Sequence, residues 1–424
     1  MSSIRSQQPP TYYLPELQIV NAEYRQLKNG IPLIVLHNNT YKVIRLDIRL
    51  RAGSYFQKKR GVALATLKTL FEGTTLHTRA QIFNAIDFQG AYLDRTIDKD
   101  FATISIHMPD YAVKDILDIV KEAFTTPSFP DSELTLLKET QKKSLAVSLE
   151  KTSVLAFREF TKTIFDTHPY ATLNEIADYD AIERQDVVDF YSTHYHASDM
   201  RVFIAGNIDD TIKKLLDQSL GEIKTAITYQ QEEQIFLLPK AIKKTIEKPD
   251  ALQSSICIGK KLFTRTHPDW MKFSVLNMIL GGYFGSRLMS EIREKKGLAY
   301  GIYSRIISYQ SAGLFYIAAD VNINKTNEAV EAVYKCLQTL ANEPISETEL
   351  NLVKNYYEGI LLRQFDGIFS IFDRYVEIND YNLTIKYWKN FLRVIQDTTA
   401  EELLVLAKSY FNTDEWIEIV VGKK

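Results

Sequence analysis

The chain has 424 residues, of which 45% are apolar and 25% charged, so it is long enough for two or three globular domains with buried cores. Its 51 Lys and Arg residues nearly balance its 53 Asp and Glu residues. The net charge of −2 argues against nucleic acid or a membrane surface as the main partner, because such partners select strongly basic proteins.

The N-terminal residues lack the apolar segment of a signal peptide, and no run of 18 apolar residues occurs in the chain. The only two cysteines, Cys257 and Cys336, are too few for a disulfide framework and are typical of a reducing compartment. These features predict a soluble cytoplasmic protein without an anchor.

Apolar periodicity predicts alternating strands and helices along the chain. Alternation predicts strands over 44–50 and 102–108, and helical spacing then predicts a helix over 113–124. A strand over 314–321 and a helix over 330–340 repeat this order in the second half. The pattern indicates an α+β fold, with an antiparallel-rich sheet covered by helices on one face.

An internal repeat divides the chain. The segments 133–138 (Glu-Leu-Thr-Leu-Leu-Lys) and 349–354 (Glu-Leu-Asn-Leu-Val-Lys) are similar at an offset of 216, and Gly206 and Gly422 end two apolar strands at the same offset. We therefore predict two homologous domains over 15–224 and 250–424. The segment 225–249, which contains a polar run at 230–234, is the predicted linker.

Several short motifs in both halves resemble those of the M16 metallopeptidase family, which includes insulinase-like, pitrilysin-like and processing-peptidase-like enzymes. They are Asn29-Gly30, Gly61-Val62-Ala63, Phe71-Glu72-Gly73-Thr74, His168-Pro169-Tyr170, Gly281-Gly282, Ser286-Arg287-Leu288 and Gly297-Leu298-Ala299-Tyr300. The resemblance extends from about residue 29 to residue 422. It implies two α+β domains of shared topology that close on each other as a clamshell.

Active members of this family carry His-x-x-Glu-His on a helix, where the two His bind zinc and the Glu activates a water molecule. The flanking motifs place Leu64, Leu67 and Lys68 at these positions. The family's third ligand, a Glu, falls near Ser144-Leu145, so Ser144 stands at that position. None of these side chains is a zinc ligand, so the resemblance implies that this chain holds no zinc and no other cofactor.

Related enzymes also use an Arg and a Tyr seven residues apart to bind the substrate carbonyl and its oxyanion. Arg293 and Tyr300 have this spacing within the matching motif. A cation and a phenol hydroxyl can stabilise a developing oxyanion without a metal of their own. The simpler alternatives are that Arg293 pairs with Glu291 or Glu294, and that Tyr300 is an ordinary strand residue.

Other candidate residues have structural explanations. Lys68 could mimic the missing metal charge or bind a carboxylate, but the preferred interpretation is that it faces solvent or pairs with an acid. His194 and His196 have a spacing that could chelate weakly, and the glycines at 281, 282 and 285 lack the Lys of a phosphate loop. We expect all of these residues to serve the fold.

Three functions follow from these observations. The leading hypothesis is a non-catalytic subunit of a heterodimeric zinc peptidase, which supplies Arg293 and Tyr300 to a zinc-bearing partner and binds a peptide substrate; a homodimer is the other assembly considered. The second is a structural or peptide-holding clamshell that adds peptides as strands without cleaving them. The third is an autonomous peptidase with an unrecognised metal site, which seven scattered His residues do not favour.

Overall fold

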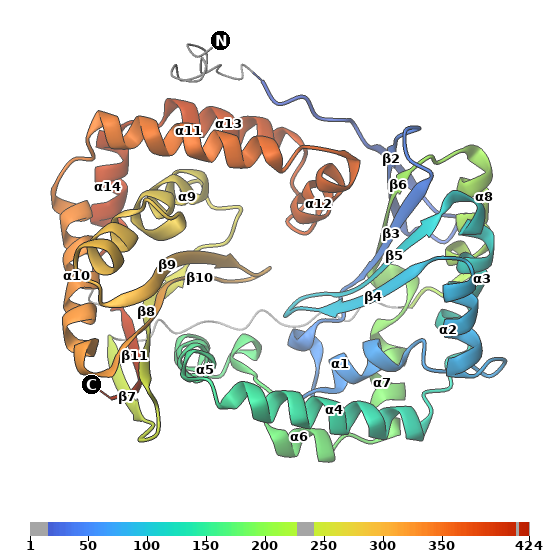
Figure 1. Ribbon diagram of the computed structural model, residues 1–424. Helices are drawn as coiled ribbons and strands as arrows, with labels where there is room; N and C mark the ends of the chain where they lie inside the picture. The colour runs from blue at the N-terminus through green and yellow to red at the C-terminus, as the bar shows by residue number, and fades with distance from the viewer. Residues whose placement is uncertain (1–15, 227–240, 413–414, 424) are drawn as a thin grey trace, which may run out of the picture.

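A computed structural model describes residues 16–226, 241–412 and 415–423. Each half of the chain forms one sheet with helices around it, and the two sheets lie on opposite sides of the molecule (Figure 1). None of the helices within these ranges is long and apolar enough to cross a bilayer.

The first sheet has six strands in the order β1-β2-β6-β3-β5-β4, and only β2 and β6 pair in parallel. The strands are β1 (Glu23–Gln26), β2 (Pro32–His37), β3 (Val43–Leu50), β4 (Tyr92–Ile97), β5 (Ala102–Pro109) and β6 (Met200–Gly206). Strand β4 lies at the edge, paired only with β5. The predicted strands over 44–50 and 102–108 are confirmed as β3 and β5.

The second sheet has five strands in the order β7-β11-β8-β10-β9, and only β7 and β11 pair in parallel. The strands are β7 (Ile242–Glu247), β8 (Gln253–Leu262), β9 (Ala299–Ser308), β10 (Gly313–Asn322) and β11 (Ile417–Gly422). Strand by strand, this order matches β2-β6-β3-β5-β4 of the first sheet. The predicted α+β fold with two homologous halves is therefore confirmed.

The second sheet begins inside the segment that the sequence analysis assigned to the linker, because residues 242–247 form β7. Most of this strand is exposed, and its Lys243-Lys244 pair gives no alternation of apolar residues. Residues 227–240, the centre of the predicted linker, lie outside the described residues.

The helices repeat with the sheets. Those of the first half are α1 (Val62–Thr69), α2 (Arg79–Phe88), α3 (Val113–Thr125), α4 (Asp131–Leu149), α5 (Thr152–Phe165), α6 (Ile176–Asp180), α7 (Arg184–His194) and α8 (Asp210–Gln218). Those of the second are α9 (Trp270–Asn277), the π-helical turns η7 (Met278–Gly282) and η8 (Met289–Lys295), α10 (Thr326–Asn342), α11 (Glu347–Arg363), α12 (Ile368–Asn379), α13 (Lys386–Asp397) and α14 (Ala400–Tyr410). The first residues of α4 and α11, of α5 and α12, and of α7 and α14 are each 216 residues apart.

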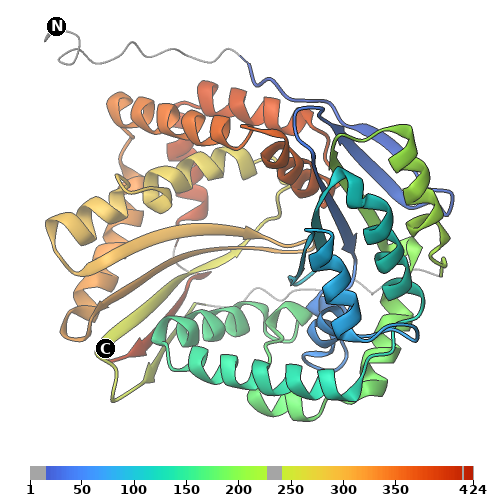
Figure 2. The same cartoon turned by 45° about the vertical axis from the view of Figure 1, so that its right-hand side comes forward.

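The two halves exchange a helix. Helix α5 of the first half packs against β8 and β11 of the second sheet, where Phe160 and Ile164 join a core with Cys257 (Figure 2). Gly259 lies in this contact, where a Cβ atom would be 2.0 Å from the Phe315 carbonyl oxygen of β10 and 2.9 Å from the Phe160 ring of α5. Helix α12 of the second half packs in turn against β6 of the first sheet, with the Phe372 ring 6.1 Å from that of Phe203.

Polar contacts also join the halves. Arg49 on β3 donates two hydrogen bonds of 2.7 and 2.6 Å to Asp380, which follows α12. The tips of the β4–β5 and β9–β10 hairpins meet where the backbone N–H of Gln310 donates to Asp100 at 3.0 Å. Tyr170 donates to the same carboxylate at 2.5 Å. Burial raises the pKa of Asp100 to about 6, opposed by these two hydrogen bonds.

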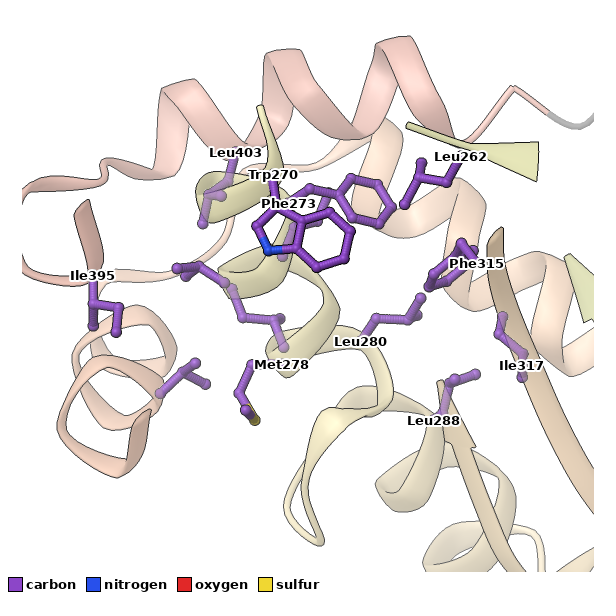
Figure 3. Packing of buried hydrophobic residues seen from close by; sticks show 14 of the residues in the cluster. Leu262, Trp270, Phe273, Met278, Leu280, Leu288, Phe315, Ile317, Ile395 and Leu403 are labelled. Carbon is purple, nitrogen blue, oxygen red and sulfur yellow. The ribbon is translucent and has the colours of Figure 1, made fainter. Parts of the chain in front are cut away.

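The largest hydrophobic core lies in the second half, around helix α9 (Figure 3). Trp270 and Phe273 of α9 are buried between the second sheet and helices α13 and α14. The Phe273 and Phe315 rings meet edge to face with centroids 5.5 Å apart. This core fixes the position of η7, η8 and β9, which carry the candidate residues of the second half.

Candidate functional site

The segment that resembles the family's zinc-motif helix forms helix α1. Its residues Leu64 and Lys68 are half-buried and lie one turn apart on the same face, whereas Leu67 is completely buried. The helix packs against α4, α7 and β4, all within the first half. Leu67, which the resemblance aligns with the family's catalytic Glu, therefore supports the core.

Lys68 is tied to the edge strand β4. Its ammonium donates to the backbone carbonyl of Arg95, and the Arg95 guanidinium donates back to the carbonyl of Lys68. Arg95 also pairs with Glu72 at 2.9 Å. Burial and the nearby Arg95 lower the pKa of Lys68. Neither solvent nor a carboxylate is the main partner of this lysine, which instead fastens α1 to β4.

The residues at which the resemblance implies a third ligand lie on α4, where Ser144 is exposed and Leu145 is half-buried against the first core. Leu145 therefore occupies the side of α4 that faces the protein, and Ser144 does not. Within the described ranges, no group of three or more His, Cys, Asp or Glu side chains could hold a metal ion. The donor set in this half does not fit zinc.

The histidines singled out in the sequence have structural surroundings. Burial and the nearby Lys261 lower the pKa of His168 to about 4, and its Nδ1 accepts from the backbone N–H of Tyr170 at 3.1 Å. His194 is buried against Phe190, with ring centroids 4.5 Å apart, and burial lowers its pKa to about 4. His196 contacts the Thr193 carbonyl at 3.0 Å.

Arg293, which is half-buried, stacks on the exposed ring of Tyr300 in the second half. The Arg293 guanidinium carbon lies 5.5 Å from the Tyr300 ring centre and 4.7 Å from that of Phe284. Tyr300 is 88% exposed and Phe284 61% exposed. Arg293 thus lies between two solvent-facing rings, which hold its planar group by cation–π attraction.

No ion pair of Arg293 occurs in the described part of the chain. Glu291 pairs instead with Lys295 at 3.2 Å and Lys296 at 3.8 Å. The predicted alternative, pairing of Arg293 with Glu291 or Glu294, is therefore not what the structure shows. Phe284 was not predicted as a site residue, although it lies in the glycine turn between Gly282 and Gly285.

A cavity of about 790 Å³ lies beside Tyr300. Its walls come from β8, β9 and β10 of the second half and from α5 of the first, with Phe157, Tyr303 and Tyr316 among the rings. Cys257 lies in its wall, and burial raises the pKa of this thiol well above its usual value, so it is not a nucleophile. The cavity is mostly apolar and large enough for a peptide segment.

The two sets of family positions lie in different halves. Leu64 and Lys68 contact the first half, whereas Arg293 and Tyr300 contact each other and Phe284 in the second. None of the described contacts joins the two sets. The exposed pair is thus available to a group outside this chain.

Comparisons with known proteins identify the family. The family model "Insulinase (Peptidase family M16)" matches residues 33–174, and "Peptidase M16 inactive domain" matches residues 181–357. The uncharacterized zinc protease YmxG of Bacillus subtilis is 22% identical over 403 residues, which are 93% of this chain and 96% of that protein. The uncharacterized zinc protease ML0855 of Mycobacterium leprae is 23% identical over 348 residues, or 81% and 78% of the two chains.

Two solved structures share the whole fold. The peptidase M16 inactive domain from Pseudomonas fluorescens has a TM-score of 0.88 at 24% identity, covering 95% of this chain and 98% of that one. A protease from Helicobacter pylori has a TM-score of 0.86 at 17% identity, covering 96% and 100%. Because the two family models together match most of the chain, and relatives match it nearly end to end, this protein belongs to the M16 peptidase family.

Proposed function

We propose that this chain is the zinc-free subunit of a two-chain M16-type peptidase. In this assembly a partner chain holds the zinc ion, and Arg293 and Tyr300 bind the scissile carbonyl of a peptide and stabilise the oxyanion that forms on it. The chain performs no hydrolysis alone, because Leu64, Leu67 and Lys68 cannot ligate zinc or activate water.

The observation that carries the proposal is the exposure of the Arg293–Tyr300 stack. Tyr300 is 88% exposed, and Arg293 forms no ion pair with a carboxylate in the described ranges. Both side chains keep hydrogen-bond donors for an incoming oxygen. Donors that are already in place where charge develops lower a reaction barrier without reorganising at the moment of reaction.

The cavity beside Tyr300 supports a peptide as the ligand. Tyr300 itself is part of its wall, so a segment bound there would pass directly by the donor pair. Its rings and aliphatic side chains suit apolar residues of an extended peptide, and Asp320 and Ser255 add polar contacts.

The test uses the complex of this chain with a chain from the same genome that contains His-x-x-Glu-His, purified together. We expect Arg293→Ala and Tyr300→Phe to leave the complex intact and to lower kcat/KM for peptide cleavage about 10²–10³-fold each, the usual effect of losing one oxyanion donor. Size-exclusion chromatography and zinc content check that the complex and its metal are unchanged.

Matched variants separate this role from general effects of charge or ring loss. Arg363→Ala and Tyr111→Phe change an exposed Arg and an exposed Tyr elsewhere, and should leave cleavage unchanged. If all four variants cleave peptides at the normal rate, the oxyanion role is refuted. The peptide-holding clamshell then becomes the better explanation, provided that the chain still binds the peptide.

We place the protein in the cytoplasm, because its two cysteines, Cys257 and Cys336, are both free thiols, as is usual in a reducing compartment. One structural neighbour, the periplasmic protease PqqL from Escherichia coli, shares the fold at 15% identity with a TM-score of 0.79. This chain covers 49% of that protein. Cell fractionation of the native host tests the compartment, and recovery with periplasmic markers would overturn it.

A further inference from the structure

A second cavity, of about 400 Å³, lies in the second half between β9, the α9–η7 segment and helices α11 to α13. Its lining is more polar and more highly charged than that of the cavity beside Tyr300, although Tyr303 contributes to both. Six aromatic residues and three arginines line it, against one carboxylate. The aromatic residues are Trp270, Tyr303, Tyr357, Tyr387, Trp388 and Phe391.

The three arginines are Arg265, Arg305 and Arg374, and the carboxylate is Glu377. Glu377 is shared between two of them, at 2.5 Å from Arg265 and 2.5 Å from Arg374. The single carboxylate of Glu377 thus pairs with two guanidinium groups that are both largely removed from water. The Nε–H groups of Arg265 and Arg374 have no hydrogen-bond acceptor among the described residues. The cluster therefore keeps an excess of positive charge in a setting where unbalanced charge is costly.

Arg305 adds a third cation at the exposed side of β9. Its guanidinium carbon lies 4.8 Å from the Tyr303 ring centre, and no ion pair of Arg305 is found in the described ranges. Stacking on a ring fixes the plane of the guanidinium, and one side of Arg305 hydrogen-bonds the Tyr316 hydroxyl. Its remaining N–H groups can still donate to a carboxylate.

The uncharged residues that line the cavity indicate which kind of group is attached to the anion. The Arg265 guanidinium carbon lies 5.3 Å from the Trp270 ring centre and 6.0 Å from that of Trp388. The same rings present their remaining surface to the cavity, together with Met278 and Phe391. These rings favour an apolar group beside the anion, because burying apolar surface against rings is favourable. The lining also holds the Tyr387 hydroxyl and the Asn277 Oδ1 atom, which have no hydrogen-bond partner among the described residues and can contact the polar part of a ligand.

We infer that this cavity binds a carboxylate attached to a small apolar body, as in the C-terminal residue of a peptide or in a free acylated amino acid. The carboxylate pairs with Arg305 and Arg374, and the apolar group packs between Trp270 and Trp388. The inference does not depend on the oxyanion role, since it uses neither Arg293 nor Tyr300.

The position of the cavity gives this binding a structural consequence. Arg374 and Glu377 lie on α12, the helix of the second half that packs against the first sheet. On the same helix, Asp373 pairs with Arg45 of β3 at 2.8 Å. A ligand on Arg374 is therefore attached to the element that joins the two halves.

Tryptophan fluorescence of the purified full chain provides a direct test. Two of the three tryptophans, Trp270 and Trp388, line the cavity, and the third, Trp416, is buried elsewhere against Phe315. The probes are N-acetylleucine and the tripeptide Ala-Ala-Leu, each compared with its C-terminal amide. We expect both acids to change the emission saturably, and each amide to bind at least about tenfold more weakly, as loss of a charge-assisted hydrogen bond predicts.

Substitutions locate the site. Arg305→Gln and Arg374→Gln should each weaken binding of the acids about tenfold or more, whereas Arg363→Gln, an equal charge loss at the exposed end of α11, should not. Arg305 is exposed, so its variant keeps the test decisive if Arg374→Gln fails to fold.

The ratio of the two acids identifies the source of the carboxylate. Tighter binding of Ala-Ala-Leu assigns the cavity to peptide C-termini, and equal or tighter binding of N-acetylleucine assigns it to free acids. Equal binding of acids and amides, or binding unaffected by Arg305→Gln, would overturn the inference, as would the lack of any saturable change.

Discussion

Helix α1 of the first half and the Arg293–Tyr300 stack of the second use their side chains in opposite ways. On α1, Leu67 is completely buried and Lys68 holds the edge strand β4. In the stack, Tyr300 is 88% exposed, and its ring contacts Arg293 rather than the core. The side chains at the positions matching the family's zinc motif contribute to the fold, whereas Tyr300, which we propose to bind the oxyanion, contributes little to it.

This difference shows where a binding function can still reside in the chain. A buried side chain that many neighbours contact cannot reach a ligand, and its loss unfolds the protein before it affects activity. An exposed ring and an unpaired guanidinium add little to the free energy of unfolding, so their arrangement is free to serve a partner or a substrate. Measurements of stability and activity on the same variants can therefore test this difference.

The largest effect is expected for Leu67→Ala. Removing a fully buried Leu side chain should lower the free energy of unfolding by about 2–5 kcal/mol, because it deletes buried surface and leaves a cavity. Tyr300→Ala should change it by less than about 0.5 kcal/mol, as is usual for exposed positions. Urea unfolding followed by circular dichroism measures both, and Leu64→Ala, at a half-buried position on the same helix, should fall between them. Similar values for Leu67→Ala and Tyr300→Ala would contradict the comparison.

The second effect concerns Asp100, which lies where the tips of the β4–β5 and β9–β10 hairpins connect the two halves. Its pKa is raised from 3.8 to about 6, so the native state binds this proton more tightly than the unfolded chain does. This group therefore stabilises the native state at low pH relative to high pH, and its contribution declines as the pH rises from about 4 to about 6. The decline amounts to about 3 kcal/mol at 1.36 kcal/mol per pKa unit.

Asp100→Asn keeps the shape of the side chain and removes the titration. We expect the free energy of unfolding of the variant, relative to the natural chain, to increase by about 3 kcal/mol between pH 4 and pH 7. Urea unfolding at several pH values measures this difference, in which the other titrating groups cancel. Parallel pH profiles for the two proteins would show that Asp100 does not titrate in this range.

The smallest effect is expected for Lys68→Met, which keeps the apolar stem and removes the ammonium. Loss of its hydrogen bond to the Arg95 carbonyl should lower the free energy of unfolding by about 1 kcal/mol. Cleavage by the complex should not change, because this lysine serves the fold. Lys143→Met, on the exposed side of α4, is the matched control and should leave stability unchanged. Loss of cleavage with Lys68→Met would instead give this cation a role in binding substrate.

Most of the topology was predictable from the repeat. The offset of 216 residues predicted two like halves, and the strand order of both sheets follows it. Strand β7 was missed because five of its six residues are exposed, which leaves no apolar alternation to detect. The helix exchange was also missed, since periodicity shows which face of a helix is apolar but not which sheet that face covers.

The candidate site was predictable only in part. Motif spacing located α1 and the Arg293–Tyr300 pair, but counting residues could not choose between Ser144 and Leu145. On a helix, a shift of one residue turns the side chain by about 100°, so only the packing of α4 shows that Leu145 faces the protein. The stacking of Phe284 on Arg293 depends on how a glycine turn folds back, which no periodicity encodes.

The exchange of α5 and α12 has a consequence for the order of synthesis. The last strand of the first sheet ends at Gly206, but the helix that covers its apolar residue Phe203 begins only at Ile368. During translation, the apolar surface around Phe203 therefore remains uncovered until most of the second half has left the ribosome. We therefore expect the first half, made alone, to keep its own core but to leave Phe203 uncovered until α12 is present.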